Sequence, residues 1–550
     1  FCAAPLNLAI YGHDPNKIIK ELCYMNFSAI IGRLRTDAGM TQEKLAELVG
    51  VSRQAVQKWE SGSALPDIDN IIKLSKYFNV SVDALIFDSD RRTSEELSFD
   101  KKLSPQYSTM HGWENYSTQL ITELTQSLEE GKDIGAYEEL FRAVAKLPNG
   151  DAKTKIADIL FEIVLNAPVR DGYGYNEPSD LETIKLLRPD TAKPARAPEA
   201  DKLYDKIYGA WVGRTCGCLL GKPVEGIRTN ELVPLLKLTG NYPMTRYIRD
   251  AELTDEVCSK FNYRLKGKCY PDTIDCAPVD DDTNYTVLAS VLIDRYGVDF
   301  TPWDVSRVWL DYQPKNAYCT AERVAFRNFV MGYNPPESAI YKNPYREWIG
   351  AQIRGDYFGY INPGNPELAA EMAWRDASIS HIKNGIYGEM FASAMIAEAA
   401  VCDDIREIIE SGLGQIPATS RLTVDVKSVL AMYDEGKSVD DCFAFIHEKW
   451  NEYTDHGWCH TISNAMIVAA ALIYGGGDYT RSIGLAVQTG FDTDCNGATV
   501  GSVLGMRNGF AALPSEWYEP IGDKLATSIF GVGTVKLSDM AKKTLAVATR

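Results

Sequence analysis

Two groups of aspartates have the residue types and spacing of a cation site. Three consecutive aspartates occupy positions 280–282, and Asp492 and Asp494 stand in the motif Gly-Phe-Asp-Thr-Asp-Cys-Asn-Gly. Each group lies at the start of a stretch with helical character, where one carboxylate can cap the helix for about 0.3–1 kcal/mol. More than one acid exceeds that need, and neighbouring carboxylates repel each other unless a cation is present. Capping is the plainer alternative, but the pattern indicates a site for hard, oxygen-ligated cations.

Helices must bring these two groups of aspartates together, and the spacing of the glycines indicates which helices do so. Glycine recurs at every fourth residue in two segments, at 209, 213, 217 and 221 and again at 497, 501, 505 and 509. A glycine inside a helix costs about 1 kcal/mol relative to alanine, so eight of them need a compensating cause. A helix face without side chains lets two backbones approach closely. We therefore expect two central, tightly packed helices, with each other as candidate partners. Glu225 follows the first on a turn, and Asp492 and Asp494 begin the second.

The region 25–88 has a different pattern, which is helix, tight turn and helix. Thr41 and Ser52 are N-cap candidates for two successive helices, and Gly50 permits the sharp turn between them. Glutamine and arginine side chains on the second helix could form bidentate contacts with adenine and guanine. The residues expected to contact DNA are Gln42, Ser52, Arg53, Gln54, Gln57 and Lys58.

This region resembles the lambda-repressor/Cro-like helix-turn-helix family over residues 27–88, with Ser-Arg-Gln-Ala-Val-Gln-Lys-Trp-Glu-Ser-Gly as the specific match. The resemblance implies a small five-helix domain that lays its second motif helix in the major groove of double-stranded DNA. A polar helical hairpin that serves only as a protein contact is the plainer alternative.

Composition limits what the rest of the chain can be. Its 550 residues are 45% hydrophobic and 24% charged, which fits two to four soluble domains and excludes a collagen-like or wholly disordered protein. The formal charge of −18 argues against a general nucleic-acid coat, although not against one small DNA-reading domain. Twelve dispersed cysteines without a CxxC pair, and only six histidines, favour a reducing cytoplasm over a secreted or zinc-stapled protein. The longest apolar run, 465–474, is about half the ~20 residues of a membrane span, so we expect no membrane contact.

Three segments follow from these patterns. Residues 25–88 form the helix-turn-helix head, residues 89–200 read as a polar linker and helical connector without recognisable chemistry, and residues 201–550 carry the acids and glycines. Apolar residues recur at spacings of three and four, and few stretches alternate in the manner of strands. The sequence therefore predicts an all-α protein.

The C-terminal segment resembles the ADP-ribosylglycohydrolase family over residues 203–545, on the runs 209–226, 280–283 and 490–505. The resemblance implies a large all-α bundle that cleaves the glycosidic bond at the ribose C1″ of an ADP-ribosylated substrate with two divalent cations, Mg²⁺ or Mn²⁺. The metal-ligand role passes to Asp280, Asp281, Asp282, Asp492 and Asp494. The catalytic role passes to Glu225, Asp282 and Asp492, with Glu225 orienting or deprotonating the water.

Three positions depart from the family pattern, one of them Cys218, which replaces the usual aspartate of the first glycine-rich run. Four other positions are candidates for substrate binding. Asp280 stands where the family usually has threonine, and Cys495 where it has serine or threonine, which leaves the metal preference open because a thiol is a poor Mg²⁺ ligand. The substrate-binding candidates are His381, Arg354, His460 and Asn464. Arginine is a suitable partner for a diphosphate, although a salt bridge and a structural histidine are the plainer alternatives.

The sequence thus predicts a metal-dependent hydrolase of an ADP-ribosylated protein or ADP-ribosyl conjugate, fused to a sequence-specific DNA-binding domain. Homodimerisation would supply the DNA-binding area that a nearly neutral head lacks as a monomer. The main alternative is a transcriptional regulator whose hydrolase-like domain senses ADP-ribose or a related nucleotide without turnover. A non-catalytic structural relative is a third. The intact set of acids favours the enzyme, because a sensor does not need a negatively charged metal cage.

Overall fold

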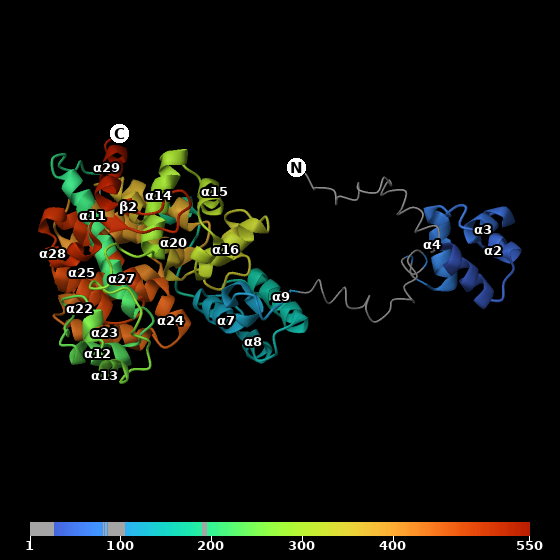
Figure 1. The fold of residues 1–550 in the computed structure, drawn as a ribbon, viewed down its shortest axis with the longest axis horizontal. Coiled ribbons are helices and arrows are strands. Elements are labelled where there is room, and N and C mark those ends of the chain that lie inside the picture. The colour runs from blue at the N-terminus through green and yellow to red at the C-terminus, as the bar shows by residue number, and fades with distance from the viewer. Residues whose placement is uncertain (1–26, 81, 83–84, 86–104, 190–194) are drawn as a thin grey trace. The chain divides into compact units, whose positions relative to one another are not determined.

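The computed structural model describes residues 27–80, 82, 85, 105–189 and 195–550. The chain forms two compact units, Phe1–Gln106 and Tyr107–Arg550 (Figure 1). Both are helical in their described parts, and two short strands, β1 (Lys524–Leu525) and β2 (Val535–Lys536), pair antiparallel. The predicted all-α fold is therefore confirmed. Within the same ranges, no helix combines the length and the apolar character that crossing a membrane requires.

The head is built on the predicted caps. Residues 27–37 are helical, and α2 (Gln42–Val49), α3 (Arg53–Glu60) and α4 (Ile68–Phe78) follow. Thr41 and Ser52 accept the hydrogen bonds of α2 and α3 that their N-cap positions require, and Gly50 ends α2 in the left-handed region at φ 82°. Beyond residue 80, the remainder of the predicted five-helix domain lies outside the described residues, apart from two helical positions at 82 and 85.

The large unit is a bundle with one extensive apolar core. Its α-helices in chain order are α7 (Leu120–Glu129), α8 (Glu138–Ala145), α9 (Asp151–Asn166), α10 (Leu181–Leu186), α11 (Leu203–Gly221), α12 (Thr229–Leu238), α13 (Asp255–Cys258), α14 (Asp281–Tyr296), α15 (Pro302–Tyr312), α16 (Thr320–Val330), α17 (Glu337–Ile340), α18 (Asp356–Tyr360), α19 (Pro366–Ala377), α20 (Lys383–Ala399), α21 (Ile405–Leu413), α22 (Arg421–Asp434), α23 (Val439–Lys449), α24 (Asp455–Cys459), α25 (Thr461–Gly475), α26 (Tyr479–Gln488), α27 (Thr493–Asn508), α28 (Ser515–Tyr518) and α29 (Leu537–Ala548).

Helices α11 and α27 lie antiparallel against each other at the centre of this bundle (Figure 1). Their glycines face each other in register, Gly209 with Gly505, Gly213 with Gly501 and Gly217 with Gly497. A Cβ atom on any of the six would overlap a backbone carbonyl of the facing helix. The expectation of two tightly packed central helices is confirmed, and each is the other's partner.

Residues 107–189 belong to the same compact unit as the domain that follows them. Helices α7, α8 and α9 enclose a small apolar core of their own, which includes Tyr116 and Phe161, and Tyr341 of the following domain packs against it. This part of the segment that the sequence treats as a connector is therefore a helical layer on the large domain. The local sequence does not predict that packing, because Glu123 and Glu130 of this segment form their ion pairs with Arg346, which lies more than 200 positions later in the chain.

Candidate functional site

Four of the predicted acids line one cavity of about 140 Å³: Glu225, Asp281, Asp492 and Asp494. They arrive on separate elements. Glu225 directly follows the 3₁₀ turn η6 (Lys222–Val224), Asp281 opens α14, and the other two lie at the N-terminus of α27. Three segments that are distant in the sequence thus place carboxylates at one point of the bundle.

The glycine ladder explains why two of these segments meet. Gly221, the last residue of α11, lies against the backbone of Thr493 and Asp494, and the Thr493 hydroxyl donates a hydrogen bond to the Gly221 carbonyl at 3.0 Å. Phe491 immediately precedes the aspartates with φ at 58°, in the left-handed region that costs a bulky residue energy. This turn holds Asp492 and Asp494 at the end of α11, beside the segment that carries Glu225.

The electrostatics of the cavity follow from the crowding of its acids. Burial and the neighbouring charges of Asp280 and Asp494 raise the pKa of Asp281 to about 7. Burial and Asp280 raise the pKa of Asp494 to about 6, although Lys222 opposes the change. The charge of Asp494 and then burial raise the pKa of Glu225 well above its ordinary value. Each acid therefore resists ionisation while the others are charged, which favours a bound cation.

A half-buried lysine and a buried arginine, neither of them predicted from the sequence, pair with the other two aspartates. Lys222 Nζ lies 2.6 Å from Asp280 Oδ2, and Asp280 Oδ1 accepts the backbone N–H of Asp282, so both oxygens of Asp280 have partners. Burial would raise the pKa of Asp280, but Lys222 brings it below its ordinary value. Arg214 of α11 lies 3.3 Å from Asp282 and 2.8 Å from Asp356. A charged residue within a helix of glycines and apolar residues was the available signal for Arg214.

The residues present fit a hard divalent cation. Asp282 Oδ2 and Asp494 Oδ1 are buried, and neither has a hydrogen-bond partner in the part of the chain that the structure describes. Unpaired buried carboxylate oxygens are costly unless a cation binds them. The nearby thiols are poor competitors, because burial and the aspartates raise the pKa of Cys218 and Cys495 and keep both protonated. The donor set is thus oxygen, as Mg²⁺ and Mn²⁺ prefer.

Asn464 lies directly behind the acids and positions one of them. Its Oδ1 accepts the backbone N–H of Asp492 at 3.2 Å and the side-chain amide of Asn496 at 2.8 Å. Its Nδ2 donates to the carbonyls of Trp458 and His460. Asn464 was predicted to bind substrate, whereas here it fixes the start of α27 and does not line the cavity.

Arg354 and His381 also lie behind the cavity wall. The Arg354 guanidinium, expected at a diphosphate, is ion-paired instead with Glu322, Asp376 and Glu389. His381 is buried, with Nδ1 2.8 Å from the Ser380 hydroxyl, and burial together with Arg354 lowers its pKa well below the ordinary value. Glu322 lines the cavity itself. These two predicted substrate contacts therefore touch the protein's own side chains.

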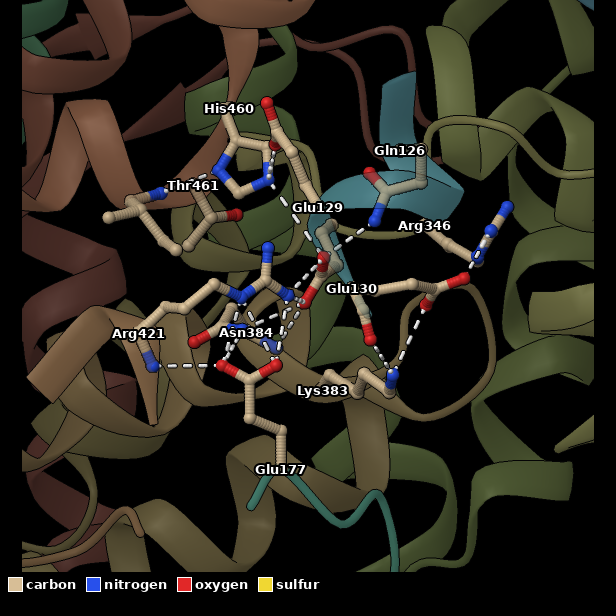
Figure 2. Close-up of polar contacts among 12 residues, drawn as sticks. Gln126, Glu129, Glu130, Glu177, Arg346, Lys383, Asn384, Arg421, His460 and Thr461 are labelled. Atoms are coloured by element: carbon tan, nitrogen blue, oxygen red, sulfur yellow. Dashed lines mark hydrogen bonds and ion pairs between the residues drawn. The ribbon is translucent and has the colours of Figure 1, made fainter. Parts of the chain in front are cut away.

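His460, the fourth substrate candidate, belongs to a buried polar network that joins residues 107–189 to the large domain (Figure 2). Glu347 is its centre, since its carboxylate accepts from Gln126 of α7 at 2.5 Å and from Arg421 at 2.7 Å. Arg421 also pairs with Glu177 at 2.9 Å. The network thus binds two parts of the preceding segment to α22 and to the residues before η9 (Ile349–Arg354).

A second set of buried ion pairs lies beside the first in Figure 2. Arg346 pairs with Glu123 at 2.8 Å and with Glu130 at 2.5 Å, and Lys383 lies 3.4 Å from Glu130. Burying such charges is costly, and removing one partner leaves an uncompensated charge. The charges of α7 and its C-terminus therefore depend on the large domain for their partners.

The histidines of this network do not form a metal centre. Glu129, His456 and His460 present ligand-type atoms close together. However, His456 Nδ1 accepts the Trp348 indole N–H at 3.2 Å, and His460 Nδ1 accepts the backbone N–H of Ile462 at 3.1 Å. Each neutral ring then carries its proton on Nε2, which leaves no lone pair there for a cation.

The helix-turn-helix surface separates the predicted DNA contacts into two groups. Gln54, Gln57 and Lys58 are exposed on α3, opposite the buried Val56 and Trp59. Ser52, Gln42 and Arg53 already have partners within the head, Ser52 as the N-cap that accepts the backbone N–H of Ala55. Gln42 Nε2 donates to Glu60 at 2.8 Å, and Arg53 pairs with Glu43 at 2.8 Å on the surface.

The comparisons with known proteins support both family resemblances that were found in the sequence. A family model described as ADP-ribosylglycohydrolase matches residues 199–548, which is more than half of the chain, and a helix-turn-helix model matches residues 31–85. The chain belongs to the ADP-ribosylglycohydrolase family. A solved "ADP-ribosylglycohydrolase-related protein complex" aligns with 64% of this chain and 99% of its own at 17% identity and a TM-score of 0.40.

Curated relatives of the head are transcription regulators. The HTH-type transcriptional activator BcrR of Enterococcus faecalis is 36% identical over 88 residues, 16% of this chain and 43% of BcrR. The SPbeta prophage-derived regulator YonR of Bacillus subtilis is 32% identical over 87 residues, 16% of this chain and 77% of YonR. This ADP-ribosylglycohydrolase family member thus spans less than half of the length of BcrR, and each of the two matches covers only 16% of this chain.

Proposed function

We propose that this family member is a metal-dependent hydrolase that cleaves the C1″ glycosidic bond of an ADP-ribosylated substrate. The observation that carries the proposal is the convergence of Glu225, Asp281, Asp492 and Asp494 on one cavity. Carboxylates that crowd one cavity repel each other and destabilise the folded protein. Their presence, with raised pKa values, therefore indicates a functional site.

The proposed ligands of the cations are Asp281, Asp282, Asp492 and Asp494, two of which have a buried oxygen without a protein partner. Asp280, predicted as a further ligand, is better suited to hold Lys222 and the start of α14. When bound, two divalent cations supply Lewis-acid chemistry that fixes ribose hydroxyls and makes a water more acidic.

The chain's own residues supply the proton handling and the orientation. Glu225 lines the cavity, where its carboxylate can orient a water and hold the proton that this water loses as it attacks C1″. Arg214 and Lys222 compensate the charges of Asp282 and Asp280, and Asn464 fixes Asp492. The transition state of the cleavage has oxocarbenium character, which nearby carboxylates stabilise.

The test is release of free ADP-ribose from ADP-ribosyl-arginine and ADP-ribosyl-serine by the full-length protein. We expect turnover with Mg²⁺ or Mn²⁺ that EDTA abolishes, and a fall of at least about 100-fold in kcat for Asp492→Asn. Asp299→Asn, at an exposed aspartate, is the matched control and should keep full activity. Turnover that persists in EDTA, or in Asp492→Asn, would overturn the proposal.

We also propose that the head binds double-stranded DNA with sequence specificity through α3. Its support is the match to helix-turn-helix regulators together with the exposed Gln54, Gln57 and Lys58. Because one chain carries both the DNA-binding head and the hydrolase-like domain, the alternative function is a transcriptional regulator whose DNA binding is controlled by ADP-ribose. Tight binding of ADP-ribose measured by calorimetry, together with no turnover of either conjugate, would favour that regulator over the hydrolase.

A further inference from the structure

A tryptophan from outside the family domain lines the acidic cavity. Trp113 lies in the 3₁₀ turn η3 (Gly112–Glu114), well before residue 199, where the family match begins. Its indole is half-buried and lines the same cavity as Glu225 and Asp281. We propose that Trp113 is a substrate-contacting residue that stacks on a planar group of the substrate, an inference that rests on the proposed function.

The neighbouring residue fixes Trp113 to one wall of the cavity. The Glu114 carboxylate pairs with Lys315 at 2.6 Å and with Arg323 of α16 at 2.7 Å, and the Glu114 carbonyl accepts from Arg327 at 2.7 Å. The first turn of α16 lines the cavity through Thr320. Three contacts hold Glu114 against this wall, and the adjacent Trp113 packs on the apolar cluster there. An aromatic ring that is already held binds a ligand at a small entropic cost.

Two further indoles complete an aromatic side of the cavity. Trp348 and Trp458 line it and pack with Trp113 in one apolar cluster. The Trp348 N–H donates to His456 Nδ1 at 3.2 Å, and the Trp458 N–H donates to the Phe491 carbonyl at 2.6 Å. Both N–H groups are therefore occupied by the protein, and the Arg228 guanidinium lies over the Trp458 ring, 4.8 Å from its centroid.

The segment 107–189 reaches this aromatic side by a second route. His456 Nε2 donates to Glu129, the last residue of α7, at 2.8 Å, while its Nδ1 accepts from Trp348. Glu129 therefore fixes the ring that in turn orients Trp348, and Glu129 is a positioning residue. The added helical layer contributes one side chain directly to the cavity and supports another.

The chemistry of the lining indicates what the indoles face. The described residues that line the cavity include five carboxylates, Glu225, Asp281, Glu322, Asp492 and Asp494, and neither lysine nor arginine. A diphosphate would find no lysine or arginine among these lining residues, although the Arg228 guanidinium lies over the Trp458 ring in this wall, whereas a planar or cationic group would find the Trp113 indole and negative charge. An ADP-ribosyl conjugate carries two kinds of planar group, the adenine and an acceptor such as guanidinium at C1″. Both the adenine and a planar acceptor can stack on an indole.

The experiment uses full-length Trp113→Ala and Trp113→Phe, with Trp303→Ala as a control at an exposed tryptophan that does not line the cavity. Three probes separate the sources of the planar group. ADP-ribosyl-arginine has adenine and a planar acceptor, ADP-ribosyl-serine has a non-planar acceptor, and free ADP-ribose has none. KM and kcat are measured for the conjugates, Kd for ADP-ribose by calorimetry, and Tm for every variant.

We expect Trp113→Ala to raise KM at least about 10-fold with kcat changed less than about 3-fold, an unchanged Tm, and recovery in Trp113→Phe. A loss confined to ADP-ribosyl-arginine identifies the acceptor as the stacked group, and an equal loss for all three probes identifies adenine. Unchanged KM and Kd values in Trp113→Ala overturn this inference alone. A rise in KM in Trp113→Ala also overturns it if Tm falls at the same time and Trp113→Phe does not restore KM. Wild-type protein that neither binds nor cleaves any probe overturns the proposed function as well.

Discussion

Gly213 of α11 and Gly501 of α27 face each other backbone to backbone, so that a Cβ on either would overlap the other's carbonyl oxygen. We expect Gly501→Ala to lower the free energy of unfolding by about 3 kcal/mol or more, because neither helix can move without displacing the acids. Urea unfolding measures the change. Gly135→Ala is the matched control, since a Cβ there meets open space and should cost almost nothing.

The raised carboxyl pKa values predict how stability depends on pH when no cation is present. Asp281 and Asp494 bind protons in the folded state up to about pH 7 and about pH 6, whereas the unfolded chain loses them near pH 4. The folded state then holds more protons, so the free energy of unfolding falls as pH rises from about 4 to 7.

Excess Mg²⁺ should oppose that loss, because it binds the ionised carboxylates and releases their protons. We therefore expect the difference in Tm between Mg²⁺ and EDTA to widen from pH 5 to pH 8 in thermal unfolding scans. Asp494→Asn should reduce this difference in Tm, because the variant lacks one of the proposed cation ligands. A difference independent of pH would contradict the cation site.

His460 predicts a second pH dependence, in the opposite sense. Burial and the neighbouring His456 lower the pKa of His460 to about 3, whereas the unfolded chain binds this proton below about pH 6.5. The unfolded state holds more protons in this range, so stability is complete above about pH 6.5 and falls as pH drops towards 3.

His460→Asn tests this, because asparagine can still cap α25 at the position where His460 accepts from Ile462. The variant should be less stable at pH 7, since His460 stacks on Trp450 at 4.6 Å, yet its stability should fall less steeply between pH 6.5 and pH 4. Equal slopes for variant and wild type in urea unfolding would count against the prediction.

The buried ion pairs of Arg346 predict that residues 107–189 depend on the large domain. Arg346→Met leaves Glu123 without its ion pair and Glu130 with Lys383 alone, which should cost about 3–5 kcal/mol. Limited proteolysis should then cut within residues 107–189 sooner than in the wild type. Arg142→Ala breaks an exposed pair with Glu138 and should cost less than about 1 kcal/mol.

For the head, we expect Gln54→Ala and Gln57→Ala to weaken binding to a selected operator about 10-fold or more and to relax its specificity. Lys58→Ala should weaken binding to all sequences and reduce its salt dependence. Fluorescence anisotropy with DNA selected from a random pool measures both. Lys44→Ala, on α2 and paired with Glu47, is the control.

The helices and the candidate acidic residues could be predicted from the sequence alone. Periodic apolar residues predicted helices throughout, caps at Thr41 and Ser52 predicted the motif of the head, and the glycine ladder predicted that α11 and α27 approach closely. These features are local or repeat at short intervals, so residue type and spacing suffice to find them.

The tertiary structure decided the rest, because it depends on partners that are far apart in the chain. Lys222 meets Asp280, Arg354 meets three carboxylates, and Trp113 enters a cavity formed by residues more than 100 positions later. A buried charge takes whatever opposite charge the fold brings beside it, and spacing along the sequence does not encode that choice. For the same reason a segment without recognisable motifs became part of the cavity wall.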